Sequence, residues 1–218
     1  MQLEVPINST QEEIKNIYED EIKFLREFLM YLEQNEGIEQ SVYLDTKRKL
    51  TIGIGKNIDL KKNFISVPFY WNAGRKLTIK EKEELFDRFS NLRDIVVKTL
   101  KKPFRHSEYG KIYISEDWAR EDAIRYLLLD LPLLKNKLRK NEIEYDFLPK
   151  TAKFALLDLQ YNLGNFNFNS EKWPNLFDAL KDKDFSKAAL ESHRSDVNYE
   201  RNKMVSDWFI YADAKFLE

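Results

Sequence analysis

Two short runs of β-prone residues constrain the fold of this chain more than any other feature. Residues 42–44 and 50–54 are rich in β-branched and aromatic side chains, and five polar residues separate them. This pattern predicts a β-hairpin. Most other apolar residues recur at helical spacing, so we expect an α+β fold that is mostly α, with a small hairpin lobe and a larger helical lobe.

Start and stop signals mark the expected helices. Thr10 and Glu13 form a capping-box pair for a helix over about 11–35, which could break near Asp20 and should end at Gly37. Pro132 should kink or split a helix over 116–139. Thr78 and Glu81 form a second capping-box pair, for a helix over about 79–101. The remaining signals predict an irregular stretch at 56–76 and helices over about 150–163, 173–181, 184–193 and 199–210.

Composition narrows the class of protein. A length of 218 residues suits one domain or two closely packed lobes. The absence of cysteine excludes disulfides and thiol chemistry. No apolar run approaches 18 residues, so we expect no membrane span, and the start of the chain has no signal-peptide pattern.

Several motifs fail on inspection. The stretch 53–56 invites two phosphate-loop interpretations, but a P-loop needs glycine where Leu50 stands, and a dinucleotide loop needs glycine at Ile58. His106 and His193 have no partners at ligand spacing. We therefore expect no metal and no cofactor.

The middle of the chain is basic. Residues 47–112 carry 17 basic and 7 acidic side chains, although the whole chain has a net charge of only -1. Such a segment forms either a solvated surface or a patch that faces a polyanion, such as cell wall or nucleic acid. No nucleic-acid motif accompanies it, so we expect no nucleic-acid partner.

Two carboxylates lie close to each other in the sequence, one just before the predicted hairpin and one in its turn. Glu36 ends a helix, Asp45 opens the hairpin turn and Thr51 begins the returning strand. Glycoside hydrolysis needs one carboxylic acid to protonate the leaving oxygen and one carboxylate to serve the water. Gly53 and Gly55 would let a substrate or a facing helix come close. On spacing alone, the two acids could equally be polar caps.

The sequence around these residues resembles the catalytic signature of phage-type lysozymes, glycoside hydrolase family 24. The resemblance rests on Glu-Gly at 36–37, Tyr-Leu-Asp-Thr at 43–46 and Leu-Thr-Ile-Gly-Ile-Gly at 50–55. It implies a lysozyme-like two-lobe fold and an inverting muramidase, which cleaves the β-1,4 bond between N-acetylmuramic acid and N-acetylglucosamine. It also implies that Glu36 is the general acid and that Asp45 and Thr51 hold the attacking water.

A weaker likeness extends over residues 115–210. The segments 115–131, 154–164, 184–189 and 201–209 resemble the linking helix and the later helices of the family. Asn57 and Tyr161 occupy positions where some members contact sugar, although Tyr161 could equally be a core residue. Arg201 stands where an arginine pairs with the catalytic glutamate in some members, so we expect it to orient Glu36.

The chain departs from the family in three places. Lys56 replaces the usual histidine, which puts a local salt bridge in doubt rather than catalysis. Residues 1–23 are an N-terminal helical extension, and an insertion occupies about 58–114. The insertion belongs to a small lobe at 24–114, and a linking helix and the helical lobe follow at 115–218. The extension could pack on the helical lobe or dock a delivery or immunity partner. The insertion could be a lid, an extended substrate wall or a surface for such a partner. In the insertion, residues 69–71 could be exposed but more readily form a core anchor.

Rival functions remain open at this point. A lytic transglycosylase needs the acid but not the water-holding Asp45, and a non-catalytic cell-wall-binding module predicts the loss of a catalytic group. A nucleic-acid-binding protein has only the basic segment in its favour. We expect a monomeric, bacteriolytic enzyme whose partner is bacterial peptidoglycan, made in the cytoplasm and released or delivered to the wall by another system. Endolysin, tail lysozyme, secreted antimicrobial toxin and host remodelling enzyme all fit.

Overall fold

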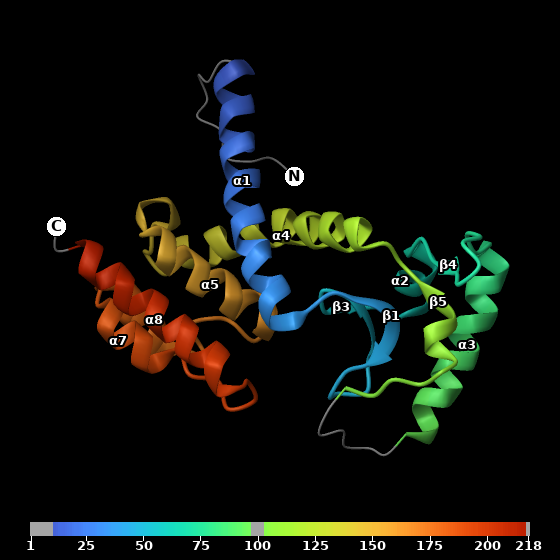
Figure 1. The fold of residues 1–218 in the computed structure, drawn as a ribbon. Coiled ribbons are helices and arrows are strands. Elements are labelled where there is room, and N and C mark those ends of the chain that lie inside the picture. Colours follow the sequence, from blue (N-terminus) through green and yellow to red (C-terminus); the bar gives the residue numbers. More distant parts are fainter. Residues whose placement is uncertain (1–10, 97–102, 217–218) are drawn as a thin grey trace. The chain divides into compact units, whose positions relative to one another are not determined.

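The chain folds into an α+β structure that is mostly helical, as the sequence predicts (Figure 1). The computed structural model describes the backbone of residues 11–96 and 103–216, and the side chains of residues 19–96 and 103–213. Its helices are α1 Gln11–Glu36, α2 Lys61–Ser66, α3 Ile79–Ile95, α4 Glu116–Arg139, α5 Lys150–Leu163, α6 Pro174–Lys181, α7 Phe185–Glu191 and α8 Tyr199–Phe216, with 3-10 turns at Tyr109–Lys111 and Tyr145–Phe147.

The chain divides into two compact units. One comprises Arg26–Arg125, and the other comprises the residues up to Leu25 together with Tyr126–Glu218. Helices α1 and α4 belong in part to each unit. None of the described helices is long and apolar enough to cross a membrane.

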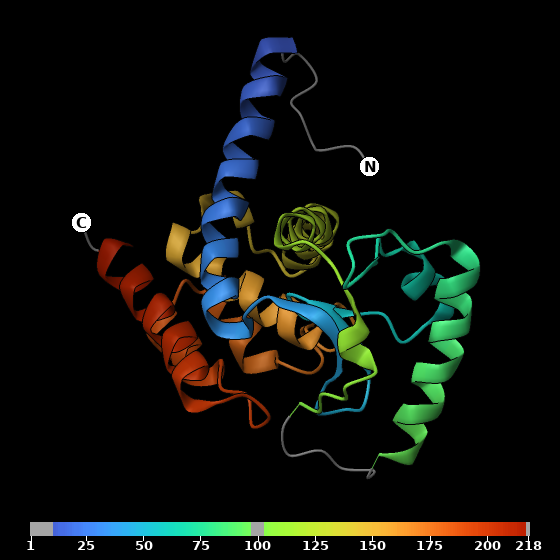
Figure 2. The same ribbon diagram turned by 45° about the vertical axis from the view of Figure 1, so that its right-hand side comes forward.

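Helix α1 is one unbroken helix (Figure 2), so the expected break near Asp20 is wrong. Asp20 is exposed, and an exposed polar side chain does not interrupt the backbone hydrogen bonds. The predicted stop is confirmed, since Gly37 has a φ of 69° and its N–H donates to the Glu33 carbonyl at 3.0 Å. The Thr10 cap lies outside the described residues.

The Arg26–Arg125 unit contains a five-stranded sheet in the order β3-β2-β1-β5-β4. The predicted hairpin is confirmed by the antiparallel pairing of Tyr43 with Thr51 and of Leu44 with Leu50. The strands are β1 Glu39–Leu44, β2 Leu50–Gly53, β3 Lys56–Asn57, β4 Tyr70–Trp71 and β5 Ile112–Tyr113. The last three have two residues each, too few to show an alternating pattern in the sequence.

The insertion packs against this sheet with its own apolar residues. Phe64, Phe69 and Phe89 are fully buried, and the Phe64 ring lies 4.8 Å from that of Phe69 and 5.9 Å from that of Phe89. Phe69 is therefore a core anchor. The expectation of an irregular stretch at 56–76 is wrong, because it contains β3, α2 and β4.

The predicted capping box of α3 is confirmed. Thr78 Oγ1 accepts from the Glu81 N–H, and the Glu81 carboxylate accepts from the Thr78 N–H. The helix ends at Ile95, because the backbone of Val96 is extended. Val96 was expected to be helical, so at this residue the helix is shorter than predicted. The rest of the predicted helix, 97–101, lies outside the described residues.

The other unit is built from helices. Its buried apolar residues come from the second half of α4 and from α5 to α8, and include Leu134, Leu156, Phe177 and Phe209. Of the two effects expected of Pro132, a kink or a split, the split is wrong, because α4 continues through it. Burial of Leu131 and Leu134 on either side holds the helix together despite the backbone hydrogen bond that proline lacks.

The end of the N-terminal extension packs on this helical unit. Glu21 Oε1 lies 3.1 Å from Lys135 Nζ, and directly after the extension the ring of Phe24 lies 5.0 Å from that of Phe154. This arrangement favours a packing role for that part of the extension.

Candidate functional site

The hairpin brings four residues of interest into one unit. Glu36 is the last residue of α1 and is exposed, and the left-handed Gly37 turns the chain from the helix toward β1. Asp45 follows β1, Thr51 lies in β2 and Asn57 ends β3. The helix end, the turn and the two strands β2 and β3 thus each supply one of these four side chains.

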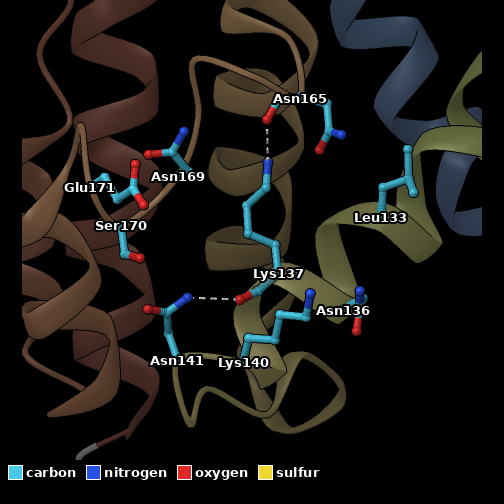
Figure 3. Close-up of a pocket in the computed structure, with 9 residues that line it drawn as sticks. All are labelled: Leu133, Asn136, Lys137, Lys140, Asn141, Asn165, Asn169, Ser170 and Glu171. Carbon is cyan, nitrogen blue, oxygen red and sulfur yellow. Dashed lines mark hydrogen bonds between the residues drawn. The ribbon is translucent and has the colours of Figure 1, made fainter.

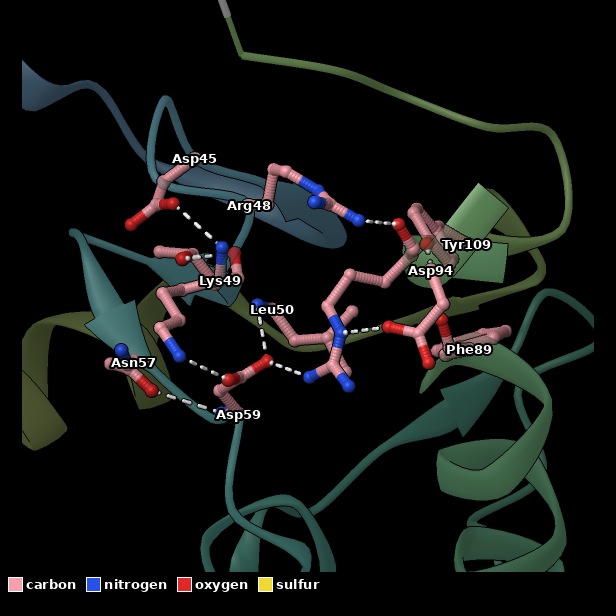
Figure 4. A network of polar contacts seen from close by, with 11 residues as sticks. Asp45, Arg48, Lys49, Leu50, Asn57, Asp59, Phe89, Asp94 and Tyr109 are labelled. Atoms are coloured by element: carbon pink, nitrogen blue, oxygen red, sulfur yellow. Dashed lines mark hydrogen bonds and ion pairs between the residues drawn. The ribbon is translucent and has the colours of Figure 1, made fainter. Parts of the chain in front are cut away.

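Asp45 anchors the turn that it opens (Figure 4). Its Oδ1 accepts from the N–H of Lys47 at 2.8 Å and from that of Lys49 at 2.7 Å, and its own N–H donates to the Lys49 carbonyl at 3.0 Å. Its Oδ2 accepts no hydrogen bond within the described part of the chain and points away from the turn in Figure 4. The turn therefore fixes the carboxylate and leaves one oxygen available.

Thr51 lies in the middle of a row across the sheet. It pairs with Tyr43 of β1 on one side and with Asn57 of β3 on the other, so the three residues are neighbours in register. Thr51 is only 3% exposed, and its hydroxyl donates to the Lys49 carbonyl at 2.9 Å. A hydroxyl that donates once still has lone pairs that can accept.

Tyr43 lies within electrostatic range of the two predicted catalytic acids. Burial, followed by the negative charges of Glu36, Asp45 and Glu39, raises the pKa of the Tyr43 phenol well above its ordinary value, against the opposing effect of Arg105. Glu36 and Asp45 are therefore both close enough to act on one phenol. No role beyond the motif could be predicted for Tyr43, because its surroundings arise only when the end of α1 and the hairpin come together in the fold.

Asn57 has a structural role as well as a predicted one. Its Oδ1 accepts from the Asp59 N–H at 3.0 Å, which stabilises the bend after β3. Its side chain is exposed, and its Nδ2 donates to no acceptor among the described residues. The amide can therefore hold the bend and still offer a donor to a ligand.

Gly53 lies against a helix. It has a φ of 63°, and a Cβ added there would meet the Ala119 Cβ of α4 at 3.4 Å. Of the two roles expected for this glycine, close approach of a facing helix is the one observed. Lys56, where the family has histidine, keeps a local salt bridge, with its Nζ 2.8 Å from Asp122 of α4.

The other two predicted residues belong to the helical unit. Tyr161 is half-buried and meets the Tyr126 ring edge-on at 5.6 Å, so it contributes to packing there. Arg201 is 5% exposed and donates from Nε and Nη2 to Asp158 Oδ1 at 2.9 and 2.7 Å. Arg194 donates to the other oxygen of the same carboxylate at 2.7 Å. The pairing of Arg201 with Glu36 stays a prediction.

A cavity of about 460 Å³ in the helical unit was not predicted (Figure 3). Asparagines, Lys137 of α4 and Lys140, which follows α4, line much of it. Lys137 Nζ donates to Gln160 Oε1 at 2.7 Å and to the Asn165 carbonyl at 3.1 Å, and burial lowers the pKa of Lys137 to about 8. Only the fold reveals this site, because its walls come from segments about 30 residues apart.

No cluster of three histidine or acidic side chains that could hold a metal ion occurs in residues 19–96 and 103–213. The sequence was also compared with known proteins. No protein-family model matches it, and no curated protein matches it.

Proposed function

We propose that this protein is a muramidase, which hydrolyses the β-1,4 bond between N-acetylmuramic acid and N-acetylglucosamine in bacterial peptidoglycan with inversion. The observation that carries the proposal is the grouping of Glu36 and Asp45 around Tyr43, with Thr51 beside it in the sheet. The sequence of these segments, which resembles the catalytic signature of glycoside hydrolase family 24, supplies the reaction class.

The hydrogen bonds of Asp45 and Thr51 favour a water-activating role. Asp45 Oδ2 is open as an acceptor, and the Thr51 hydroxyl, which already donates to Lys49, can only accept from a further partner. A water that donates one proton to each has both protons engaged and a lone pair free for the anomeric carbon. Asp45 then takes the proton as general base.

Glu36 supplies the other half of the reaction. Its exposed carboxyl at the end of α1 is accessible to a glycan. In the protonated form it donates to the glycosidic oxygen as the bond to the anomeric carbon breaks. Asn57 is proposed to donate to a sugar substituent through its Nδ2, Tyr161 to contact sugar and Arg201 to orient Glu36.

A lytic transglycosylase is the second candidate. Such an enzyme uses the 6-hydroxyl of muramic acid in place of water, so it has no need of a water held by Asp45 and Thr51. The two acceptors that the hairpin carries, Asp45 and Thr51, therefore favour hydrolysis. A wall-binding module without catalysis is the third candidate, and the presence of all three catalytic side chains is against it.

The test is digestion of purified peptidoglycan by the wild type, Glu36→Gln and Asp45→Asn, with mass analysis of the soluble products. We expect reducing muramic ends from the wild type and a loss of at least about a hundredfold in each variant. Fresh products should first show the α-anomer by NMR, because inversion changes the β configuration. Anhydro ends would identify a transglycosylase, and a folded wild type that releases nothing would contradict the proposal.

A further inference from the structure

We infer that the insertion is a brace for the catalytic turn, in which Arg93 of α3 acts as a positioning residue for Asp45. This inference rests on the proposed function. It concerns a residue 48 positions from Asp45 along the chain, within a segment that the family resemblance does not cover.

The first contact runs through Asp59 (Figure 4). Its Oδ1 accepts from Arg93 Nη1 at 2.6 Å and from the Leu50 N–H at 3.2 Å, while its Oδ2 accepts from Lys49 Nζ at 2.9 Å. Lys49 closes the turn, and Leu50 is the residue before Thr51. The Arg93 charge is therefore one carboxylate away from the residues that set the positions of Asp45 and Thr51.

The second contact runs through the backbone of Arg93. Arg48 Nη2 donates to the Arg93 carbonyl at 2.9 Å, near the end of α3. Arg48 is the third residue after Asp45, and its own N–H donates to the Asp45 carbonyl. Side chain and backbone of Arg93 thus hold the turn at two successive residues, 48 and 49.

The turn has two unfavourable features, both at Arg48, and the contacts with Arg93 help to maintain it despite them. Arg48 has a φ of 61°, which is strained for a residue with a side chain, and its buried Nε has no hydrogen-bond partner among the residues that the structure describes. The turn conformation persists because the surrounding contacts over-determine it, and strain of this kind gathers where side chains must be held for function.

The electrostatics fit a permanent contact. Burial alone would raise the pKa of Asp59, but hydrogen bonds from Lys49, the Leu50 N–H and Arg93 outweigh it and hold that pKa below its ordinary value. Asp59 and Arg93 are 11% and 23% exposed, so water weakens their attraction little. Their pairing therefore holds throughout the neutral range.

The same helix offers a matched control. Arg88 of α3 pairs with Glu108 at 3.3 Å and its side chain is 54% exposed, and no hydrogen bond or ion pair within the described part of the chain joins either residue to the turn. Arg88→Met removes one cation and this ion pair from α3, whereas Arg93→Met removes one cation, the pair with Asp59 and a pair with the neighbouring Asp94. Only the second change should reach Asp45.

The experiment compares Arg93→Met and Arg88→Met by amide hydrogen exchange and by kinetics on soluble glycan strands. The Lys47 and Lys49 amides, which donate to Asp45 Oδ1, should exchange about tenfold faster in Arg93→Met and unchanged in Arg88→Met. The kcat should fall roughly ten- to a hundredfold in Arg93→Met alone, with KM within about twofold, because the base is misplaced while the glycan contacts remain. Arg93→Lys, which keeps a positive charge beside Asp59, should recover part of the kcat that Arg93→Met loses.

Asp59→Asn serves if Arg93→Met does not fold, and should raise the same two exchange rates. Unchanged exchange in the folded variants overturns the brace. Faster exchange with wild-type kcat overturns the positioning role. A wild type without hydrolase activity contradicts the proposed function instead, and the exchange rates then still decide whether Arg93 holds the turn.

Discussion

At the scale of single residues, Asp45 carries two roles that one substitution can separate. Its Oδ1 holds the turn through two backbone N–H groups, and its Oδ2 is the proposed base. The sequence offered these as alternatives, a polar cap or a catalytic carboxylate. The geometry shows that the cap exists and that it leaves the second oxygen open, so the two interpretations are compatible.

Asp45→Asn should keep the turn and lose the base. The asparagine Oδ1 can accept the same two hydrogen bonds, while an amide nitrogen replaces the open oxygen. We expect a free energy of unfolding within about 0.5 kcal/mol of the wild type and activity reduced at least about a hundredfold. Asp45→Ala should lose activity equally and also about 1–2 kcal/mol of stability. Urea unfolding beside glycan digestion separates the two, and an active Asp45→Asn protein would exclude the base role.

Lys137 should give the fold a pH-dependent stability. Burial lowers its pKa in the folded protein to about 8, from an ordinary value of 10.5. Between these values the unfolded chain binds more protons, so the contribution of Lys137 to the free energy of unfolding rises with pH and is smallest below about 8. We therefore expect the free energy of unfolding of the wild type, relative to that of Lys137→Met, to be higher at about pH 9.5 than at about pH 7.5. Urea unfolding at the two pH values measures this difference. Lys140→Met, at the same cavity, controls for the lost charge, and an equal drift in both variants would contradict the assignment.

Glu36, Asp45 and Thr51 could be proposed from the sequence because they lie within 16 residues in a recognisable order. The sequence could not identify Tyr43, Asp59 or Arg93 as parts of the same site. Arg93 and Asp59 are 34 residues apart, and their hydrogen bond depends on the end of α3 reaching the hairpin. Local patterns carry no information on such a meeting.

At the scale of elements, helices with clear termini were predictable and short strands were not. Helix α5 runs over Lys150–Leu163 as its pattern predicts, and the capping box of α3 forms as expected. Strands β3, β4 and β5 exist only through their pairing with neighbours, for example Tyr70 with Tyr113. A two-residue strand has no periodicity, so tertiary contacts alone define it.

The capping box offers a test at this scale. Thr78→Ala removes the acceptor of the Glu81 N–H and should lower the free energy of unfolding of the Arg26–Arg125 unit by about 1 kcal/mol. Thr78→Ser keeps the hydroxyl and should stay close to the wild type. Urea midpoints of the three proteins, read from tryptophan fluorescence, give the comparison. A Thr78→Ala protein as stable as Thr78→Ser would show that the cap is not needed.

At the scale of the whole molecule, the excess of basic residues over 47–112 is smaller in the compact unit that contains this segment. The Arg26–Arg125 unit holds 20 basic and 16 acidic residues, so its excess is 4, where residues 47–112 alone have an excess of 10. Acids from outside the basic segment neutralise part of it directly: Glu39 pairs with Arg105 and Asp122 with Lys56. The salt sensitivity expected from a polyanion-facing patch is accordingly reduced, because paired charges contribute little to the field at a distance.

Each unit has its own apolar core, which bears on how the molecule unfolds. In Arg26–Arg125 one cluster of buried residues includes Phe64, Leu50 and Tyr109, and the helical unit buries Phe168, Phe177 and Phe209. Compact units with separate cores need not unfold in one step. The two can be addressed independently, because a cavity made in one core affects the packing of that core directly.

Phe64→Ala and Phe168→Ala should therefore lower different unfolding transitions. Each removes a fully buried ring, at a cost of about 3–5 kcal/mol to the unit that contains it. Hydrogen exchange at increasing urea should show Phe64→Ala weakening protection in β1, β2 and α3, and Phe168→Ala weakening it in α5 to α8. If both variants lower the protection of all these elements equally, the molecule unfolds as one cooperative body and the two cores are not energetically separate.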